Sequence, residues 1–319
     1  MKSRVKLMFW SAMTALAMLV TIPTLQAQET VPTAGAPVRM TVTVNVASDK
    51  RMPEINQEDI VVKQGEQRLQ VTEWVPAWGE RAKLDLFLLI DDASDKALGS
   101  HLDDLRTFIN AQASRTSVGI GYMRNATVQI VQNFTTDHAA AAQALRLPLG
   151  TAGAYGSPYL SVIDLMNRWP KSQSRREVLM MTDGIDRARR APRWRGLSIN
   201  PDVDTASDVA MRTGTIIHTI YAPGVGRLHR NYWEATNGQM GIAKLSDVTG
   251  GESFYLGLQS PVSLAPYLSD LQKILDNQYW LSFSTTPDKK ASLQYVTLNT
   301  QVAGVDFAAP DAVWVPSAK

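Results

Sequence analysis

Residues 86–95 read LFLLIDDASD, and this stretch decides the fold because five apolar residues run directly into acidic ones. A second stretch, VLMMTDGID at 178–186, repeats the pattern and places Asp183 behind its apolar run. Continuous apolar runs of this length are typical of parallel strands that are buried on both faces. The carboxyl ends of such strands meet at one edge, where open α/β sheets place their ligand sites. We therefore expect Asp91 and Asp183 to lie near each other at that edge.

The segments around these two strands alternate between helix and strand patterns, which predicts an α/β fold with a doubly wound, mostly parallel sheet. Helices are predicted near 98–109, 139–147, 159–169, 202–212, 240–248 and 264–275, and further strands at 118–122, 127–131, 216–221 and 254–256. The strands at 118–122 and 127–131 are separated by only four residues. Four residues are too few for a crossover helix, so these strands must be antiparallel neighbours. Ser100 and Asp103 resemble a capping pair at the start of the first helix.

Both ends of the chain follow a period-two pattern instead. Apolar residues alternate with polar ones from 38 to 47, and the alternation returns at 279–283, 293–297 and 313–315. We expect these ends to pair with each other into a small β-sandwich. The predicted division is a signal peptide at 1–27, a linker at 28–37, an N-terminal β segment at 38–82, the α/β domain at 83–276 and a C-terminal β segment at 277–319.

The first 27 residues have the composition of a secretory signal peptide. Three basic residues between positions 2 and 6 precede a mostly apolar run at 7–22, and Ala27 offers a cleavage site. An uncleaved membrane anchor is the alternative, but Thr14 and Thr21 interrupt a run that is already short for a full span. The expectation is an exported protein, periplasmic or secreted, whose mature chain has no membrane span.

The charge and the cysteine count exclude several classes of function. The net charge is +2, and removal of the three basic residues of the signal peptide leaves +2 − 3 = −1. This balance gives no support to a nucleic-acid partner. The chain contains no cysteine, which excludes disulfides, thiolate metal sites and cysteine nucleophiles. The partner we expect is another protein, recognised through a local site.

The order of these motifs resembles the von Willebrand factor type A domain, and more narrowly the exported bacterial proteins in which that domain has β-rich flanks. The segments that carry the resemblance are LLIDD at 88–92, LDDLR at 102–106, GSPY at 156–159, TIYAPG at 219–224, TGGES at 249–253 and VWVP at 313–316. They span nearly all of the chain after the signal peptide. The resemblance implies a six-stranded, doubly wound sheet and a protein-binding function.

The resemblance also implies a metal-ion-dependent adhesion site, which in this family combines Asp-x-Ser-x-Ser with a threonine and a later aspartate. Asp91 and Asp183 match the first and last positions, and Ser157 matches the threonine. Ala93 replaces the first serine and removes one oxygen donor, while Asp95 replaces the second. Two outcomes are open: the four remaining residues hold Mg²⁺, Mn²⁺ or Ca²⁺, or the site is a metal-free relic whose acids are solvated or paired with arginine.

A loop rich in arginine follows Asp183 directly. It contains Arg187, Arg189, Arg190, Arg193 and Arg195, with Trp194 among them. One interpretation is a rim that contacts an acidic partner or a glycan, because arginine and tryptophan are favoured at interfaces. The other is that these arginines pair with the neighbouring acids, which argues against a metal. Tyr232 and Trp233 form a further aromatic pair, which is either a recognition element or a loop anchor.

These patterns predict an exported, non-enzymatic protein-binding module, used for adhesion or assembly, with a degenerate adhesion site at the carboxyl edge of its sheet. One alternative is a structural component whose vestigial site does nothing. Another is a phosphohydrolase of the haloacid dehalogenase type, which requires a second acid two residues after its nucleophile and a lysine at the phosphate. Ala93 occupies the position of that second acid, which disfavours the hydrolase.

Overall fold

The computed structural model describes residues 35–46, 53–77, 83–188, 200–225, 231–254 and 261–317. The predicted signal peptide and most of the predicted linker lie outside these ranges. So does most of the predicted arginine rim, namely Arg189, Arg190, Arg193, Trp194 and Arg195. Within the described ranges, no helix has both the length and the apolar character needed to cross a bilayer.

The α/β part is built on a six-stranded sheet with the order β6-β5-β4-β7-β8-β9. Its strands are β4 (Leu84–Asp91), β5 (Thr116–Arg124), β6 (Thr127–Thr135), β7 (Arg175–Thr182), β8 (Thr215–Tyr221) and β9 (Ser253–Phe254). All neighbours are parallel except β5 and β6, which form the predicted antiparallel hairpin. The chain leaves β4 toward β5 and later continues on the other side with β7. The topological switch point therefore lies between β4 and β7, which are the two strands that end in acid.

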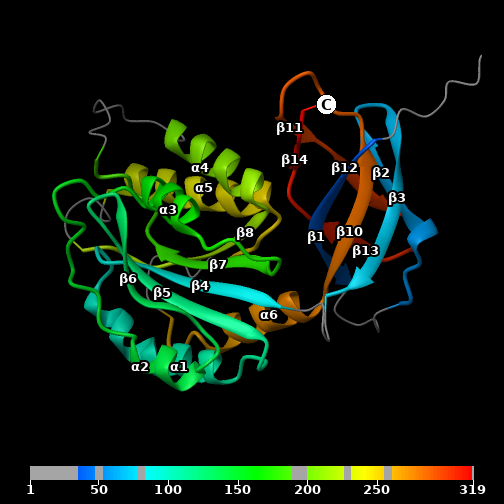
Figure 1. Ribbon diagram of the computed structural model, residues 1–319. Coiled ribbons are helices and arrows are strands. Elements are labelled where there is room, and N and C mark those ends of the chain that lie inside the picture. Colours follow the sequence, from blue (N-terminus) through cyan, green and yellow to red (C-terminus); the bar gives the residue numbers. More distant parts are fainter. Residues whose placement is uncertain are drawn as a thin grey trace, which may run out of the picture. The chain divides into compact units, whose positions relative to one another are not determined.

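Helices cover both faces of this sheet (Figure 1). One face carries α1 (Leu102–Asn110), α2 (His138–Gln143) and α6 (Ala265–Asp276), and the other carries α3 (Pro158–Arg168), α4 (Pro201–Thr213) and α5 (Tyr232–Thr249). Successive side chains of β4 alternate between the two cores. Leu88 packs into the core with α1 and α6, whereas Phe87 and Leu89 pack into the core with α3 and α4. Because both faces are buried, every residue of β4 and β8 is buried, as the apolar runs predicted.

Two helix starts differ from the prediction. A 3₁₀ turn (Lys96–His101) precedes α1, and Ser100 donates its hydroxyl to the carbonyl of Ala97 instead of capping α1. The predicted capping pair is therefore wrong. Helix α5 begins at Tyr232, eight residues before the predicted start at 240, because the Asn231 side chain accepts from the Trp233 amide at 3.0 Å. Tyr232 and Trp233 thus lie in the first turn of a helix.

The β part interleaves strands from both ends of the chain, as their alternation predicted. Its six-stranded sheet has the order β12-β2-β3-β10-β1-β13, and β11 and β14 pair separately. The strands are β1 (Ala36–Val46), β2 (Ile60–Gln64), β3 (Gln67–Pro76), β10 (Gln278–Thr285), β11 (Ser292–Tyr295), β12 (Thr297–Thr300), β13 (Val305–Ala308) and β14 (Ala312–Val315). Strand β1 pairs with β10 along eight residues, with Met40 opposite Leu281. Val313 and Val315 of β14 join the same hydrophobic core.

Candidate functional site

The carboxyl edge of the sheet brings Asp91 and Asp183 together, as predicted from the two apolar runs. Strand β4 ends with Asp91, and Asp183 follows the last residue of β7. These strands are parallel, with Ile90 opposite Met181, so their ends emerge side by side. Both carboxyl groups are buried, and the Thr182 hydroxyl between them donates to Asp91 Oδ2 at 2.8 Å.

Asp91 has both of its oxygens occupied by protein donors. The Ala93 amide donates to Oδ1 at 2.8 Å, and the Thr182 hydroxyl takes Oδ2. Burial, reinforced by the negative charge of Asp183, raises the pKa of Asp91 to about 6, although Arg187 acts in the opposite direction. Burial and Asp183 therefore disfavour the ionised form of Asp91, and the neighbouring Arg187 favours it.

Asp183 is paired with an arginine from its own loop. Arg187 places Nη2 2.5 Å from Oδ2 and Nη1 3.2 Å from Oδ1, and the Ile185 amide donates to Oδ1 at 3.0 Å. Burial alone would lower the pKa of Arg187, but Asp183, Asp91 and Asp186 together raise it above its ordinary value. The guanidinium is therefore a permanent positive charge among three carboxylates.

Ser157 lies in the loop next to this pair but serves a structural purpose. It is the N-cap of α3, where its hydroxyl oxygen accepts from the Leu160 amide at 3.3 Å. The same hydroxyl donates to Asp186 Oδ2 at 2.7 Å. The Asn200 amide group also donates to Asp186 Oδ2, at 2.9 Å. The hydrogen-bonding capacity of Ser157 is thus directed at a helix end and at Asp186.

Asp95 is exposed, and its carboxylate accepts from the Ala97 amide at 2.8 Å. It therefore caps the 3₁₀ turn that precedes α1. Its backbone amide donates to the carbonyl of Pro223 at 2.9 Å, and the Val225 amide donates to Ala93 at 2.9 Å. These two bonds fasten the loop after β4 to the segment after β8.

The four oxygen-bearing residues predicted as metal ligands do not fit a divalent cation in this arrangement. Asp91 and Asp183 are adjacent, but Asp183 gives both oxygens to Arg187, and Ala93 supplies none. Asp95 and Ser157 use their side chains as helix caps. Across the part of the chain that the structure describes, no cluster of three or more acidic, histidine or cysteine side chains is arranged to hold a metal ion.

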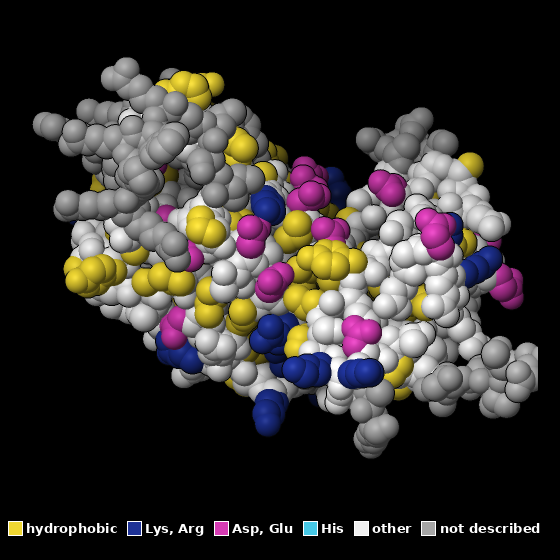
Figure 2. Space-filling model, turned by 90° about the horizontal axis from the view of Figure 1, so that it is seen from above, with side chains coloured by type: hydrophobic (Ala, Val, Ile, Leu, Met, Phe, Trp, Pro, Cys, Tyr) yellow, Lys and Arg dark blue, Asp and Glu magenta, His cyan; other side chains and the backbone are white. Residues whose placement is uncertain are grey.

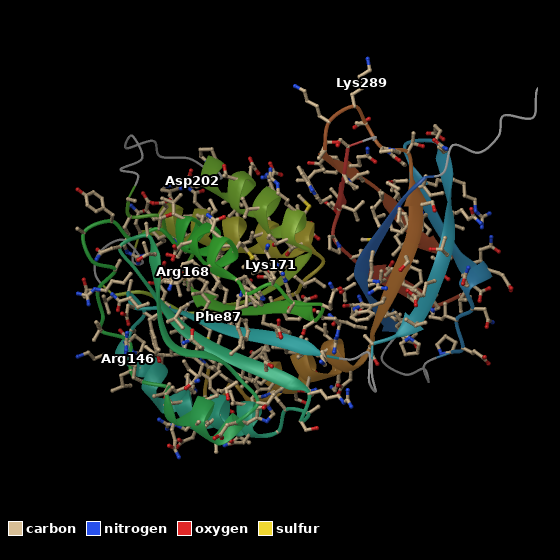
Figure 3. All side chains as sticks on the ribbon, in the orientation of Figure 1. Phe87, Arg146, Arg168, Lys171, Asp202 and Lys289 are labelled. Carbon is tan, nitrogen blue, oxygen red and sulfur yellow. The ribbon has the colours of Figure 1, made fainter. Side chains whose placement is uncertain are left out.

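Asp92, a further acid at this edge, has a partner that the sequence did not reveal. Its side chain is fully buried and contacts Arg146 through two hydrogen bonds, of 2.7 and 2.9 Å. The guanidinium also lies over the Tyr122 ring, 3.6 Å from the centroid, and the Leu149 amide donates to Asp92 at 3.2 Å. Figure 3 shows Arg146 at the end of the sheet. The sequence placed Arg146 in a helix, but α2 ends at Gln143.

Asp92 and the β5–β6 turn thus hold the loop between α2 and α3. The Thr151 amide donates to the Asp92 carbonyl at 2.8 Å, and the Asn125 amide donates to the Ala152 carbonyl at 3.0 Å. The Asn125 side chain in turn accepts from the Ala154 amide at 2.8 Å. Because backbone groups make most of these bonds, the loop has a defined conformation that does not depend on a ligand.

The burial of Asp91 beside Asp183 predicts how the stability of the protein depends on pH. We expect Asp91→Asn to gain stability relative to the wild type as the pH rises from 4.5 to 7.5. The folded-state pKa of about 6 lies above the ordinary value of 3.8, so the wild type loses stability as Asp91 ionises in this window. Asparagine remains neutral throughout, and two pKa units set an upper limit of about 3 kcal/mol.

Urea unfolding of both proteins at the two pH values measures this difference. Asp208→Asn, at an exposed position on α4, is the control and should show little change with pH. An Asp91→Asn variant whose stability differs from that of the wild type by the same amount at both pH values would contradict the prediction.

No protein-family model matches the sequence, and no curated protein matches it. Among solved structures, the chain is similar to a von Willebrand factor type A protein from Catenulispora acidiphila, with 9% identity, 90% of this chain and 75% of that chain covered, and a TM-score of 0.46. The chain is also similar to BatB from Bacteroides thetaiotaomicron, with 12% identity and a TM-score of 0.43; the match covers 60% of this chain and 97% of BatB. A third similar structure is an aerotolerance-related membrane protein from Bacteroides fragilis, with 10% identity and a TM-score of 0.42; the match covers 60% of this chain and 98% of that chain. At these identities the likeness concerns the fold alone.

Proposed function

We propose that this chain, whose α/β part has the fold of von Willebrand factor type A domains, is an exported, non-enzymatic module that binds another protein. The binding surface in this proposal is the carboxyl edge of the sheet. The single observation that carries it is the exposure of large apolar side chains on the loops and helix starts of that edge. Exposed apolar groups that cluster in one region mark interaction sites more often than isolated ones do.

Most of the described large apolar residues that are exposed belong to segments at this edge. They are Leu147, Leu149 and Tyr155 in the loop before α3, Tyr232 and Trp233 at the start of α5, and Val262 before α6. Tyr155 is 67% exposed and Tyr232 is 68% exposed. By contrast, the helix face seen in Figure 2 mixes hydrophobic side chains with acidic and basic ones. An ordinary solvated surface has that mixed character.

Hydrogen bonds fix two of the segments that carry these apolar side chains before any partner arrives. The loop that carries Tyr155 is fastened by Asp92 and Asn125, and Asn231 caps the helix turn that carries the aromatic pair. The rings of Tyr232 and Trp233 contact each other edge to face, with centroids 5.3 Å apart. Fixed aromatic side chains lose little conformational entropy on binding, which favours affinity.

The arginine-rich sequence after Asp183 indicates which kind of partner we propose. Arg187 is already paired with Asp183, but four further arginines follow it within eight residues of sequence. We therefore propose a protein partner with an acidic surface beside an apolar patch. In the hydrolase alternative Asp91 would be the nucleophile, but it is buried and both of its oxygens accept hydrogen bonds from the chain, which disfavours that role.

Photo-crosslinking in the native cell envelope tests the location of the surface. A benzophenone amino acid in place of Tyr155 is expected to capture a protein partner, whereas the same group in place of Tyr295 is not. Tyr295 is the matched control because it is 65% exposed and lies on β11 of the β part. Capture from position 295 alone would contradict the proposed surface.

The double variant Tyr232→Ser, Trp233→Ser tests the energetics. We expect at least a roughly tenfold weaker interaction with the captured partner, because interface aromatics commonly contribute more than 1 kcal/mol each. Tyr295→Ser, Trp314→Ser is the control. Trp314 is 37% exposed and Trp233 is 38% exposed, so the two pairs match. Equal losses in both double variants would argue against the carboxyl edge.

A further inference from the structure

We propose that the Arg187 guanidinium permanently occupies the role that a divalent cation has in metal-binding members of this fold. The carboxyl edge of this protein would then hold its shape and bind without metal. The inference concerns the same edge as the proposed function, but its test requires no partner, so either idea can fail alone.

The charges at the site require a cation. Asp91 and Asp183 lie at the ends of adjacent strands, both are buried, and their mutual repulsion contributes to the raised pKa of Asp91. Two buried carboxylates without compensation are strongly unfavourable. Arg187 supplies the compensating charge from within the chain, and its side chain is only 15% exposed.

The geometry of Arg187 matches this role. A guanidinium presents a planar fork that binds a carboxylate through two bonds, and both oxygens of Asp183 are engaged in this way. The Arg187 amide donates to the Gly156 carbonyl at 2.6 Å, and the Ala188 amide donates to the same oxygen at 2.9 Å. Through these backbone amides the loop after β7 is joined to the loop before α3, so two of the three segments that carry predicted ligands meet at Arg187.

A further segment, which follows β8 and carries none of the predicted ligands, closes over the ion pair. A side chain at Gly224 would overlap Asp183 Oδ2 and Arg187 Nη2, so the backbone of this segment lies directly on the pair. Ala93 and Asp95 are hydrogen-bonded to the same segment, through Val225 and Pro223. An adhesion site must leave one position open for a carboxylate of the partner. Here the backbone at Gly224 fills the space beside the charge.

The roles of the other predicted ligands agree with a site that needs no metal. Ala93 contributes only its backbone, Asp95 caps a 3₁₀ turn, and Ser157 caps α3. The loss of an oxygen ligand at Ala93, and the use of Asp95 and Ser157 as caps, would each weaken a cation site. In the present arrangement all three residues make hydrogen bonds within the chain. The departures of this sequence from the family pattern are therefore consistent with a site in which Arg187 supplies the positive charge.

Thermal unfolding and calorimetry with metal salts test the proposal. The wild-type melting temperature should be the same in EDTA and in millimolar Mg²⁺, Mn²⁺ or Ca²⁺, and titration of each ion should produce no binding heat. Arg187→Ala should lower the melting temperature in EDTA by roughly 5 °C or more, because it leaves two buried acids uncompensated. Millimolar Mn²⁺ should restore part of that loss in the variant and leave the wild type unchanged.

Two controls separate this role from an ordinary ion pair. Arg168→Ala removes another arginine paired with an aspartate four residues away, but at a more exposed site, and should change the melting temperature little with or without Mn²⁺. Arg187→Ala combined with Asp183→Asn should lose the response to Mn²⁺. If Arg187→Ala does not fold, Arg187→Lys keeps the charge without the fork and should show a smaller loss of the same kind.

Three results would overturn the proposal. The first is binding of Mg²⁺, Mn²⁺ or Ca²⁺ to the wild type with a rise in its melting temperature. The second is an Arg187→Ala variant as stable as the wild type. The third is a destabilised Arg187→Ala variant that melts at the same temperature in EDTA and in Mn²⁺. Each of these is measurable whether or not a protein partner is ever found.

Discussion

Replacing Gly184 with alanine is expected to destabilise the protein by about 4 kcal/mol, because two independent penalties meet at this residue. Gly184 has a φ of +70°, a conformation that costs an alanine about 1 kcal/mol. In addition, its new methyl group would overlap the backbone carbonyl of Gly238 in α5. Backbone atoms on both sides cannot move aside, so α5 or the end of β7 must shift.

Gly214→Ala is the matched control for this prediction. Gly214 ends α4 with a φ of +64°, and a methyl group there would meet nothing within 4 Å. It should therefore cost only about 1 kcal/mol, the conformational penalty alone. Chemical denaturation of both variants measures the two losses. Equal losses would show that the contact between the strand end and α5 contributes nothing.

Replacing Asp92 with alanine should cost about 3 kcal/mol, since it removes one partner of a buried ion pair. Arg146 would lose both of its bonds to the carboxylate, and the Leu149 amide would lose its acceptor. We also expect faster proteolysis within residues 145–157, because this loop loses two of its anchors. Denaturation and limited proteolysis together measure these effects.

Asp103→Ala is the control for the second prediction. Asp103 pairs with Arg106 on the surface of α1, where its side chain is 91% exposed. Surface pairs of this kind contribute little, so the variant should unfold and be digested like the wild type. An Asp92→Ala variant with an unchanged digestion pattern would mean that the loop is held by its backbone bonds alone.

Residue order was enough to predict most of the fold. The apolar runs at 86–90 and 178–181 predicted strands buried on both faces, and the four-residue gap after 122 predicted the antiparallel hairpin. Helix α5 was predicted too short: residues 234–239 read EATNGQ, a polar stretch that contains Gly238, and Gly241 follows it. In the structure these glycines give the close contacts of α5 with Asp183 and Tyr159, which no sequence period reveals.

For the candidate site, too, the sequence predicted one part and the tertiary structure decided the other. That Asp91 and Asp183 would lie together followed from the sequence alone, because parallel strands bring their carboxyl ends to one edge whatever their loops do. Only the tertiary structure decided what those acids contact. The residues that contact their partners from loops are Arg187, Arg146 and Asp95. The direction of each of these side chains depends on many backbone angles of its loop at once. Local sequence constrains each of these angles weakly, whereas packing against α3, α5 and the segment at Gly224 selects one arrangement.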